Sequence, residues 1–456
     1  MNRRILILLA IVLIASLQHS CRDREGDPGL NKKELIDEFI PVTQYHTGLL
    51  HGNKFGRLSN IWMQQLAGVR GSYVHLEVYD VPLEYMDEPW EIIYLHTNYR
   101  LNTLIDYSME LELPAHAGIA MVTKAMMFSM ATDAFGDIPF VHASEFYLGG
   151  FPEYDDQELV YEQVNNLLSD GIQLLRSAQN TNAPTPGPET DFIYQGNLNN
   201  WIKAANLLRL RNSLRISHED QNYNHSLIYI QEEDDYFTGN LDNMLFPFDI
   251  HADLPNPYYE FDQNIRHVRV GEQTVSMLLG TDDPRLPVFV RRNADNAYVG
   301  SAPGAFNQSA SYLGAGVASQ ESPIFMLTYA EQLLIKAEVY LRTGNVSAAA
   351  EAYNDALIAS LDQYDVFDEA WLVEHQLDDN LELQDIMHAK YLALFLHPEV
   401  WSDWRRTGYP ELNLAEGSAL DEIPRRYPYP QTEHLHNSQN VPEGVTITDR
   451  IWWDAE

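Results

Sequence analysis

The only cysteine of the chain, Cys21, follows a short basic and apolar N-terminus that predicts chemistry at its thiol. Residues 5–15 form an apolar run of about a dozen positions, within the range of a signal peptide and too short to span a bilayer. Ser20 supplies the small residue that a lipoprotein signal peptidase needs before a cysteine that receives a diacylglyceryl group. We predict that residues 1–20 are a signal peptide and that Cys21 is lipidated. The alternative is an ordinary signal peptide followed by a chance cysteine.

Residues 21–40 are predicted to be a lipidated N-terminus and tether, because the stretch directly after Cys21 is polar and rich in turn-forming residues. Each buried methylene of an acyl chain contributes roughly 0.8 kcal/mol to membrane binding. Later apolar stretches are interrupted by charge every few residues. The sequence therefore predicts a chain that is anchored to a membrane and does not span it.

Aromatic side chains with a polar end are unusually frequent, since 26 Tyr and 8 Trp stand against 17 Phe. Such rings can stack on the C–H face of a sugar while their polar ends form hydrogen bonds. Loops punctuated by Pro and Gly, where binding residues often lie, occur at 180–190, 246–261, 302–323 and 415–445. We predict seven ligand-binding aromatic residues: Trp62, Tyr73, Tyr79, Tyr258, Tyr259, Tyr298 and Tyr312. For each of them, packing in the core is the alternative.

The formal net charge of −37 excludes nucleic acid as a natural partner, because phosphate backbones repel so acidic a chain. The abundant carboxylates leave open a glycoside hydrolase with a carboxylate pair about 5 to 10 Å apart, but no pair is singled out. His375, His388 and His397 lack the spacing of metal ligands. We predict no enzyme and no cofactor, and a structural calcium ion stays open.

A helical hairpin over residues 328–360 is the clearest structural pattern. Apolar residues recur at helical spacing on both sides of the break at Thr343, Gly344 and Asn345. Small and aromatic residues fall on the packing positions of a tetratricopeptide repeat. These positions are Ala337, Tyr340, Gly344, Ala349, Tyr353 and Ala356.

Two further helical blocks are predicted, one pairing residues 115–133 with 159–178 and one over 198–216. In the second block Arg209, Arg211 and Arg215 are expected to pair with carboxylates. The predicted fold class is mainly α, with tetratricopeptide-like hairpins at about 115–216 and 325–361 packed with a loop-rich, ligand-facing region. Residues 41–456 are predicted to form a single domain.

Five motifs occur in one order behind the lipoprotein signal. They are 132–140 (TDAFGDIPF), 201–216 (from Trp201 to Ile216), 283–286 (DPRL), 329–338 (with YAE and KAE), and a C-terminal set comprising Trp401, 405–410 (RRTGYP), 423–430 (IPRRYPYP), Glu433 and Asn437. Together they resemble the SusD/RagB family of outer-membrane nutrient-binding lipoproteins over nearly the whole mature chain. We interpret the motifs as structural: Gly136 can take a positive φ, and Arg285 and Arg405 can brace loops.

The resemblance implies a SusD-like α-α superhelix and a non-catalytic, lipid-anchored protein of the outer membrane that faces the cell exterior. It implies capture of an oligosaccharide or another small nutrient, and a SusC-like TonB-dependent barrel transporter as partner. Besides the glycoside hydrolase, a tetratricopeptide adaptor that binds a peptide in its concave groove remains as an alternative.

Overall fold

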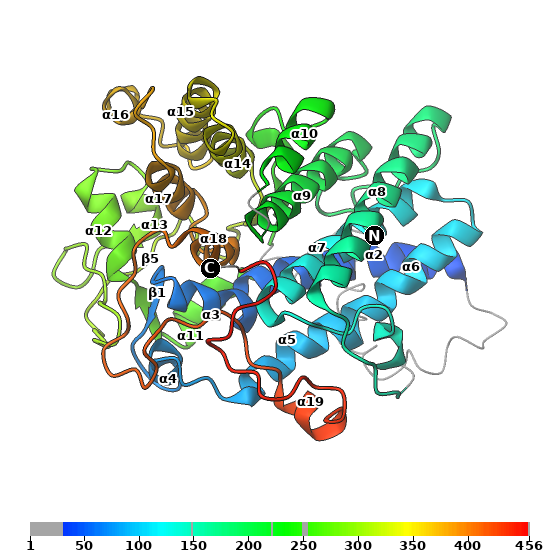
Figure 1. The fold of residues 1–456 in the computed structure, drawn as a ribbon, viewed down its shortest axis with the longest axis horizontal. Helices are drawn as coiled ribbons and strands as arrows, with labels where there is room; N and C mark the ends of the chain where they lie inside the picture. The colour runs from blue at the N-terminus through cyan, green and yellow to red at the C-terminus, as the bar shows by residue number, and fades with distance from the viewer. Residues whose placement is uncertain (1–30, 147–148, 220–221, 249–253, 455–456) are drawn as a thin grey trace, which may run out of the picture.

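The computed structural model describes residues 31–146, 149–219, 222–248 and 254–454 (Figure 1). Cys21, the predicted signal peptide and most of the predicted tether lie outside these residues. Helices make up most of the described chain, and its strands form only short two-stranded ladders, which confirms the mainly α fold. No helix within the described ranges is long and apolar enough to cross a bilayer.

The first predicted hairpin consists of α7 (Pro114–Phe135) and α8 (Gln157–Thr181). The two helices approach closely where Gly118 faces Gly171, since a Cβ on Gly118 would lie 2.9 Å from the carbonyl oxygen of Gly171. Ala117, Val122 and Met126 are fully buried in α7. Glycine thus sets the distance between the helices, and apolar side chains fill the space around the contact.

The second predicted hairpin consists of α14 (Tyr329–Arg342) and α15 (Val346–Asp362), with Gly344 at φ 84° in the turn. Thr328 caps α14 by accepting a hydrogen bond from the Glu331 N–H, and Asn345 caps α15 by accepting one from the Ala348 N–H. Of the residues predicted at the packing positions, Ala337, Ala349, Tyr353 and Ala356 are buried, whereas Gly344 is exposed in the turn. The tetratricopeptide-like hairpin is therefore confirmed, and α16 (Glu369–His375) and α17 (Leu383–Ala393) extend its hydrophobic cluster.

The helix predicted over 198–216 is α9 (Leu198–Glu219), which packs against α7, α8, α10 (Asn224–Glu232) and α14. It therefore joins the two hairpins. Figure 1 shows α8, α9, α10, α14, α15 and α16 in succession across the upper part of the molecule. This succession is the superhelical arrangement that was predicted.

The N-terminal region is more helical than predicted. The helices α2 (Lys32–Gly52) and α3 (Lys54–Trp62) begin at the capping residues Asn31 and Asn53, so residues 32–40 belong to the folded body and not to the tether. Eight of the nine residues of α3 are buried, the polar residues Arg57 and Asn60 among them. Shorter helical segments follow: α4 (Tyr73–Glu77), η3 (Leu83–Met86), α5 (Asp87–Glu91), η4 (Ile92–Asn98), α6 (Tyr99–Glu110) and η5 (Ala143–Phe146).

The loop-rich region contains three antiparallel ladders. They pair β1 (Leu66–Gly68) with β3 (Val268–Val270), β2 (Met244–Phe246) with β6 (Ile324–Leu327), and β4 (Val290–Arg291) with β5 (Tyr312–Leu313). The remaining helices are η6 (Asn240–Asp242), α11 (Pro257–Asn264), α12 (Glu272–Gly280), α13 (Leu286–Phe289), α18 (Glu399–Thr407) and α19 (Gln431–His436). In Figure 1, α4, α11, α12, β1 and β5 occupy the left side, below α14 to α17.

Candidate functional site

Four of the seven aromatic residues predicted to bind ligand lie in the core. The exposed fractions are 0% for Trp62, 7% for Tyr73, 4% for Tyr79 and 2% for Tyr258. A ring without an exposed face cannot stack on a sugar, so the predicted contact role of these four does not fit the structure. Packing in the core, the alternative for each, describes them.

The surroundings of these rings show what they do instead. Trp62 packs edge-on against Trp401 at 5.2 Å between ring centroids. The hydroxyl of Tyr258 accepts a hydrogen bond from Asn60 Nδ2 at 2.9 Å and donates to the carbonyl of Leu396 at 3.0 Å. The Tyr79 hydroxyl accepts one from the backbone N–H of Ala415. Each ring therefore joins segments that lie far apart in the sequence.

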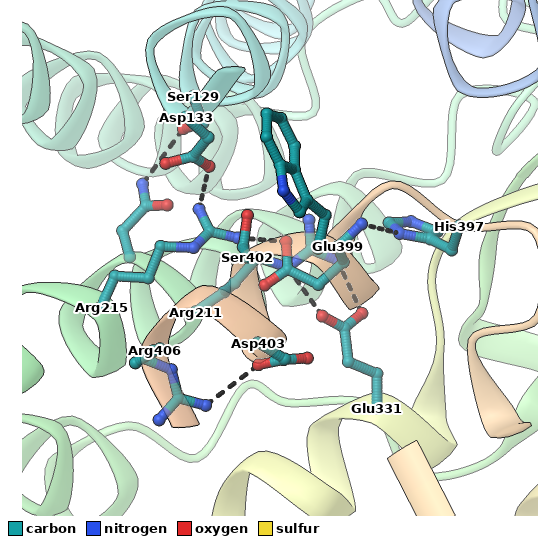
Figure 2. Close-up of polar contacts among 12 residues, drawn as sticks. Ser129, Asp133, Arg211, Arg215, Glu331, His397, Glu399, Ser402, Asp403 and Arg406 are labelled. Carbon is teal, nitrogen blue, oxygen red and sulfur yellow. Dashed lines mark hydrogen bonds and ion pairs between the residues drawn. The ribbon is translucent and has the colours of Figure 1, made fainter. Parts of the chain in front are cut away.

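The most concentrated group of ionisable side chains is fully buried where α7, α9, α14 and α18 meet (Figure 2). Arg211 donates two hydrogen bonds to the carboxylate of Glu331, from Nε at 2.7 Å and from Nη2 at 2.6 Å. Arg215 bridges Asp133 and Glu399. We call these five residues the buried charge network. The predicted pairing of Arg211 and Arg215 with carboxylates is confirmed, whereas Arg209 stacks on the ring of Tyr229 at 4.8 Å.

A second set of paired charges adjoins this network. Arg406 donates to both oxygens of Glu338, and its Nη2 donates to Asp403 at 3.0 Å. Lys390 Nζ lies 2.9 Å from the other oxygen of Asp403. Because isolated buried charges cost several kcal/mol each, these shared ion pairs keep the helices of the core in register.

The electrostatics of both sets follow from this pairing. Burial alone would raise the pKa of Glu399, but Arg215 and Arg211 outweigh it and lower the pKa to about 2. The pKa of Glu338 is lowered to about 2 in the same way, with Arg406 outweighing burial. Burial, assisted by Arg211, lowers the pKa of His397 to about 3. His397 is therefore neutral near pH 7, and its Nδ1 accepts the N–H of Glu399 at 3.0 Å.

The buried charge network does not form a catalytic site. Asp133 and Glu399 line a cavity of about 20 Å³, which is room for one water molecule and not for a sugar ring. Both carboxylates are also bound to Arg215. Within the described ranges, no group of three His, Cys, Asp or Glu side chains could hold a metal ion.

The motif residues have the structural roles predicted for them. Gly136 ends α7 with φ 79°. Arg285 donates to both oxygens of Asp283 in its own turn and to the hydroxyl of Ser360. Arg405 donates to the carbonyls of Asp133 and Arg425. These contacts hold the loops without forming a site.

The other three predicted aromatic residues, Tyr259, Tyr298 and Tyr312, are half-buried. Tyr298 and Tyr312 lie in neighbouring segments, because the Ser311 N–H donates to the carbonyl of Val299 at 2.7 Å. Tyr259 lies on α11, the helix that carries Asp262, and Asp262 pairs with Arg291 of β4 at 3.1 Å. The structure thus places these three residues on adjoining elements, and their contact with a ligand stays a prediction.

Arginine side chains cover the two neighbouring tyrosines, which the sequence analysis missed. The guanidinium of Arg292 lies 4.2 Å from the ring centroid of Tyr298, and those of Arg269 and Arg291 lie 3.7 and 4.8 Å from that of Tyr312. A signal existed in the sequence, because arginines at 266, 269, 291 and 292 gather in the loops of a strongly acidic chain. We take this surface, with Tyr259, Tyr298 and Tyr312, as the candidate ligand-binding site.

Two concavities lie elsewhere in the molecule. A cavity of about 290 Å³ beside α19 is lined by Leu83, Tyr429, His434 and Val441 among others, and approaches the size of small-molecule sites. A smaller one of about 40 Å³ is lined by the aromatic rings of Tyr258, Phe325, Tyr364 and Phe395. None of the three half-buried tyrosines lines either cavity.

The comparison with protein families gives one match. The family model SusD-like_2, described as starch-binding and associating with the outer membrane, matches residues 32–430. No protein with a curated description matches the chain.

Solved structures share the fold along nearly the full chain. A chitin-binding SusD homolog from Flavobacterium johnsoniae superposes with a TM-score of 0.80 at 23% identity, covering 93% of this chain and 98% of its own. A SusD-like protein from Bacteroides thetaiotaomicron gives 0.78 at 19% identity, with 93% and 98% covered. A SusD homolog from Bacteroides uniformis gives 0.79 at 19% identity, with 92% and 99% covered.

Proposed function

Because the chain belongs to the SusD-like family of carbohydrate-binding proteins associated with the outer membrane, we propose that it captures an oligosaccharide or similar small nutrient at the cell surface and passes it to a SusC-like TonB-dependent barrel transporter. The family match over residues 32–430 is the observation that carries this proposal. The chitin-binding description of one structural neighbour supports a polysaccharide as the source of the ligand.

The chain is a binding protein and not an enzyme, as its family is. The geometry agrees, because Asp133 and Glu399 are bound to arginine beside a cavity that admits one water molecule. The tetratricopeptide-like hairpin packs its small residues against α16 and α17, which supports a scaffold role over a peptide-binding adaptor.

Lipidation at Cys21 completes the proposal, with the protein anchored in the outer membrane and facing the exterior. Replacing Cys21 by Ala should release folded protein into the periplasm, because no acyl chain would then hold it. Fractionation and intact-mass measurement test this step. Unchanged membrane attachment of the variant contradicts lipidation.

Ligand capture is tested by calorimetry of the purified protein with a panel of oligosaccharides that includes chitin fragments. Replacing Tyr298 or Tyr312 by Ala should weaken binding by about 3- to 10-fold, because a ring that borders the site and orients its arginines is lost. Tyr340, which is half-exposed on α14, provides a matched Tyr→Ala control on another element. Equal loss in all variants, or no binding to any glycan, contradicts the proposal.

Delivery is tested separately by purifying the lipidated protein from membranes. Co-purification of a TonB-dependent barrel is expected. Recovery of soluble peptide partners alone favours the adaptor alternative.

A further inference from the structure

Four arginines gather at one corner of the loop-rich region, although basic residues are outnumbered 66 to 29 along the chain. Arg70 lies in the loop after β1, and Arg266 lies two residues before β3. Arg269 is the middle residue of β3, and Arg291 is the last residue of β4. We call these four residues the arginine cluster. Arg70, Arg266 and Arg291 are exposed.

Strand register brings these side chains together. The β1–β3 ladder pairs Gly68 with Val268, and the Val69 N–H donates to the carbonyl of His267, so Arg70 and Arg266 both lie just beyond this end of the ladder. In the next ladder Arg291 lies opposite Tyr312. Like charges that folding holds close together repel each other. Folding stability alone therefore gives no reason for this arrangement.

The tight approach of the two segments depends on Gly71. Its backbone has φ 61°, and a Cβ at this position would lie 2.5 Å from Cε1 of His267. The glycine lets the chain turn against His267 directly after Arg70. The turn thus keeps Arg70 beside the first residue of β3.

Carboxylates do not match the arginines in number here. In the part of the chain that the structure describes, Asp262 is the carboxylate that pairs with the cluster, through Arg291 at 3.1 Å. Arg70 instead donates to the side-chain amide oxygen of Gln308. The side chain of Arg266 donates no hydrogen bond to any described residue. Three of the four guanidinium groups therefore keep their positive charge without an ion pair among the described residues.

Arg269 is the most unusual member, because only 4% of it is exposed. Its guanidinium group donates hydrogen bonds to neutral acceptors. These are the carbonyls of Gln308 at 3.2 Å and Val268 at 2.7 Å, and the hydroxyl of Tyr312 at 2.7 Å. Burial lowers the pKa of Arg269, in contrast to the buried Arg211, whose carboxylate partners raise its pKa. A fixed and buried guanidinium group thus adds positive potential beneath the exposed arginines.

We propose that the arginine cluster binds an oxyanion on the captured glycan, either the carboxylate of a uronic acid residue or a sulfate ester. This inference rests on the proposed function and adds the chemical class of the ligand. Guanidinium groups match both anions because they present paired donors in a fixed plane. Arg269 and Arg291 also cover the ring of Tyr312, so the tyrosine orients the arginines as well as bordering the site.

The net charge of −37 makes this cluster selective. A chain so acidic repels anionic polymers at long range, so an anionic glycan binds only where direct contacts outweigh that repulsion. The arginine cluster offers such contacts to a single charged residue of a glycan.

The test compares matched charged and neutral probes by calorimetry. Tetragalacturonate is compared with its methyl ester, and a sulfated galactan tetrasaccharide with its desulfated form. We expect one of the two charged probes to bind at least about tenfold more tightly than its neutral partner, since hydrogen bonds to charged groups contribute about 1.5–3 kcal/mol. The pair that shows the difference identifies the anion.

The variant R266Q/R291Q should lose at least about tenfold in affinity for the charged probe, because two exposed guanidinium groups are removed. The matched control is R176Q with a second exposed substitution, K33Q, because Arg176 and Lys33 lie on α8 and α2 and their loss changes the net charge equally. The control pair should bind the charged probe like the wild type. Cooperative thermal unfolding confirms that both variants fold.

The outcomes separate the two proposals. Preference for a charged probe that disappears in R266Q/R291Q supports the inference. Equal binding of charged and neutral probes, or an equal loss in the control pair, overturns it and leaves the proposed function standing. Binding of chitin fragments and of no charged probe also overturns the inference and leaves the proposed function standing. Absence of binding to every probe, chitin fragments included, contradicts both.

Discussion

The buried charge network and the arginine cluster place the same chemical group in opposite surroundings. In the network, Arg211 and Arg215 contact carboxylates of three other helices and are sealed from water. In the cluster, Arg70 and Arg266 stay exposed without an ion pair in the described structure. Buried charge must be neutralised locally, whereas exposed charge is stabilised by water and remains available to a ligand. The contrast separates arginines that hold the fold from arginines that can bind.

The largest expected effect is the loss of Arg215. Replacing it by Met leaves Asp133 and Glu399 buried without their shared partner, so the free energy of unfolding should fall by about 3–5 kcal/mol. Urea denaturation measures this change. The comparison variant is R70Q in the cluster, which should change the stability by less than about 0.5 kcal/mol, because Arg70 is exposed and its partner Gln308 is uncharged. Equal effects in the two variants would break the comparison.

The second effect appears in acid. The folded pKa of Glu338 is about 2 against an ordinary value of 4.5, so its stabilisation is present above pH 4.5 and is lost as the pH falls towards 2. This amounts to about 3 kcal/mol for a shift of this size. Unfolding midpoints between pH 2 and 6 measure the loss. The variant E338Q should be less stable than the wild type at pH 6 and should lose less stability between pH 6 and pH 2.

The third effect has the opposite sign. Glu77 is buried and accepts hydrogen bonds from the N–H groups of Gly68 and Gly304, with no ion pair to an arginine of the described residues. Burial raises its pKa to about 8 from 4.5. Its contribution is therefore full below pH 4.5 and is lost as the pH rises through 8, by about 1 kcal/mol per pH unit. Unfolding midpoints at pH 6 and 7 test this slope. In E77Q this fall of stability between pH 6 and 7 should be absent. An unchanged slope contradicts the raised pKa of Glu77.

The smallest effect concerns Arg266, whose φ of 55° is unfavourable for any residue with a Cβ. Replacing Arg266 by Gly should raise the free energy of unfolding by about 0.5 kcal/mol, because relief of the backbone strain exceeds the entropy that glycine costs. The same variant should bind the charged glycan probe less tightly. Thermal melting and calorimetry measure the two effects, and a loss of stability would show that Arg266 supports the fold.

Most of the scaffold could be predicted from local sequence. The hairpin α14–α15 follows from apolar spacing, capping residues and a glycine in the turn, and α7 and α8 follow from their apolar residues, all of which act over a few positions. The helices α2 and α3 were missed for a physical reason. Pro41 lies inside α2, and α3 has only nine residues with Gly56 among them, so residues that usually end helices stand within both.

The candidate site was predicted only in part. Tyr298 and Tyr312 lie together near the surface, whereas Trp62 and Tyr258 are in the core. The types of these residues did not distinguish the two groups, because tyrosine and tryptophan suit both a core with hydrogen-bond partners and a wet surface. The partner that buries Trp62 is Trp401, more than three hundred positions later in the chain.

The sequence by itself determined the helical hairpins, the acidic charge and the motifs of the family, since each depends on residue types at short spacing. The tertiary structure decided which charges are neutralised. Arg215 meets Glu399 across 184 positions, and Arg269 meets Tyr312 across 43. Whether an arginine holds the core or faces a ligand depends on the groups that folding brings next to it, and the strength of a charge interaction depends on its distance and burial in space, not on separation along the chain.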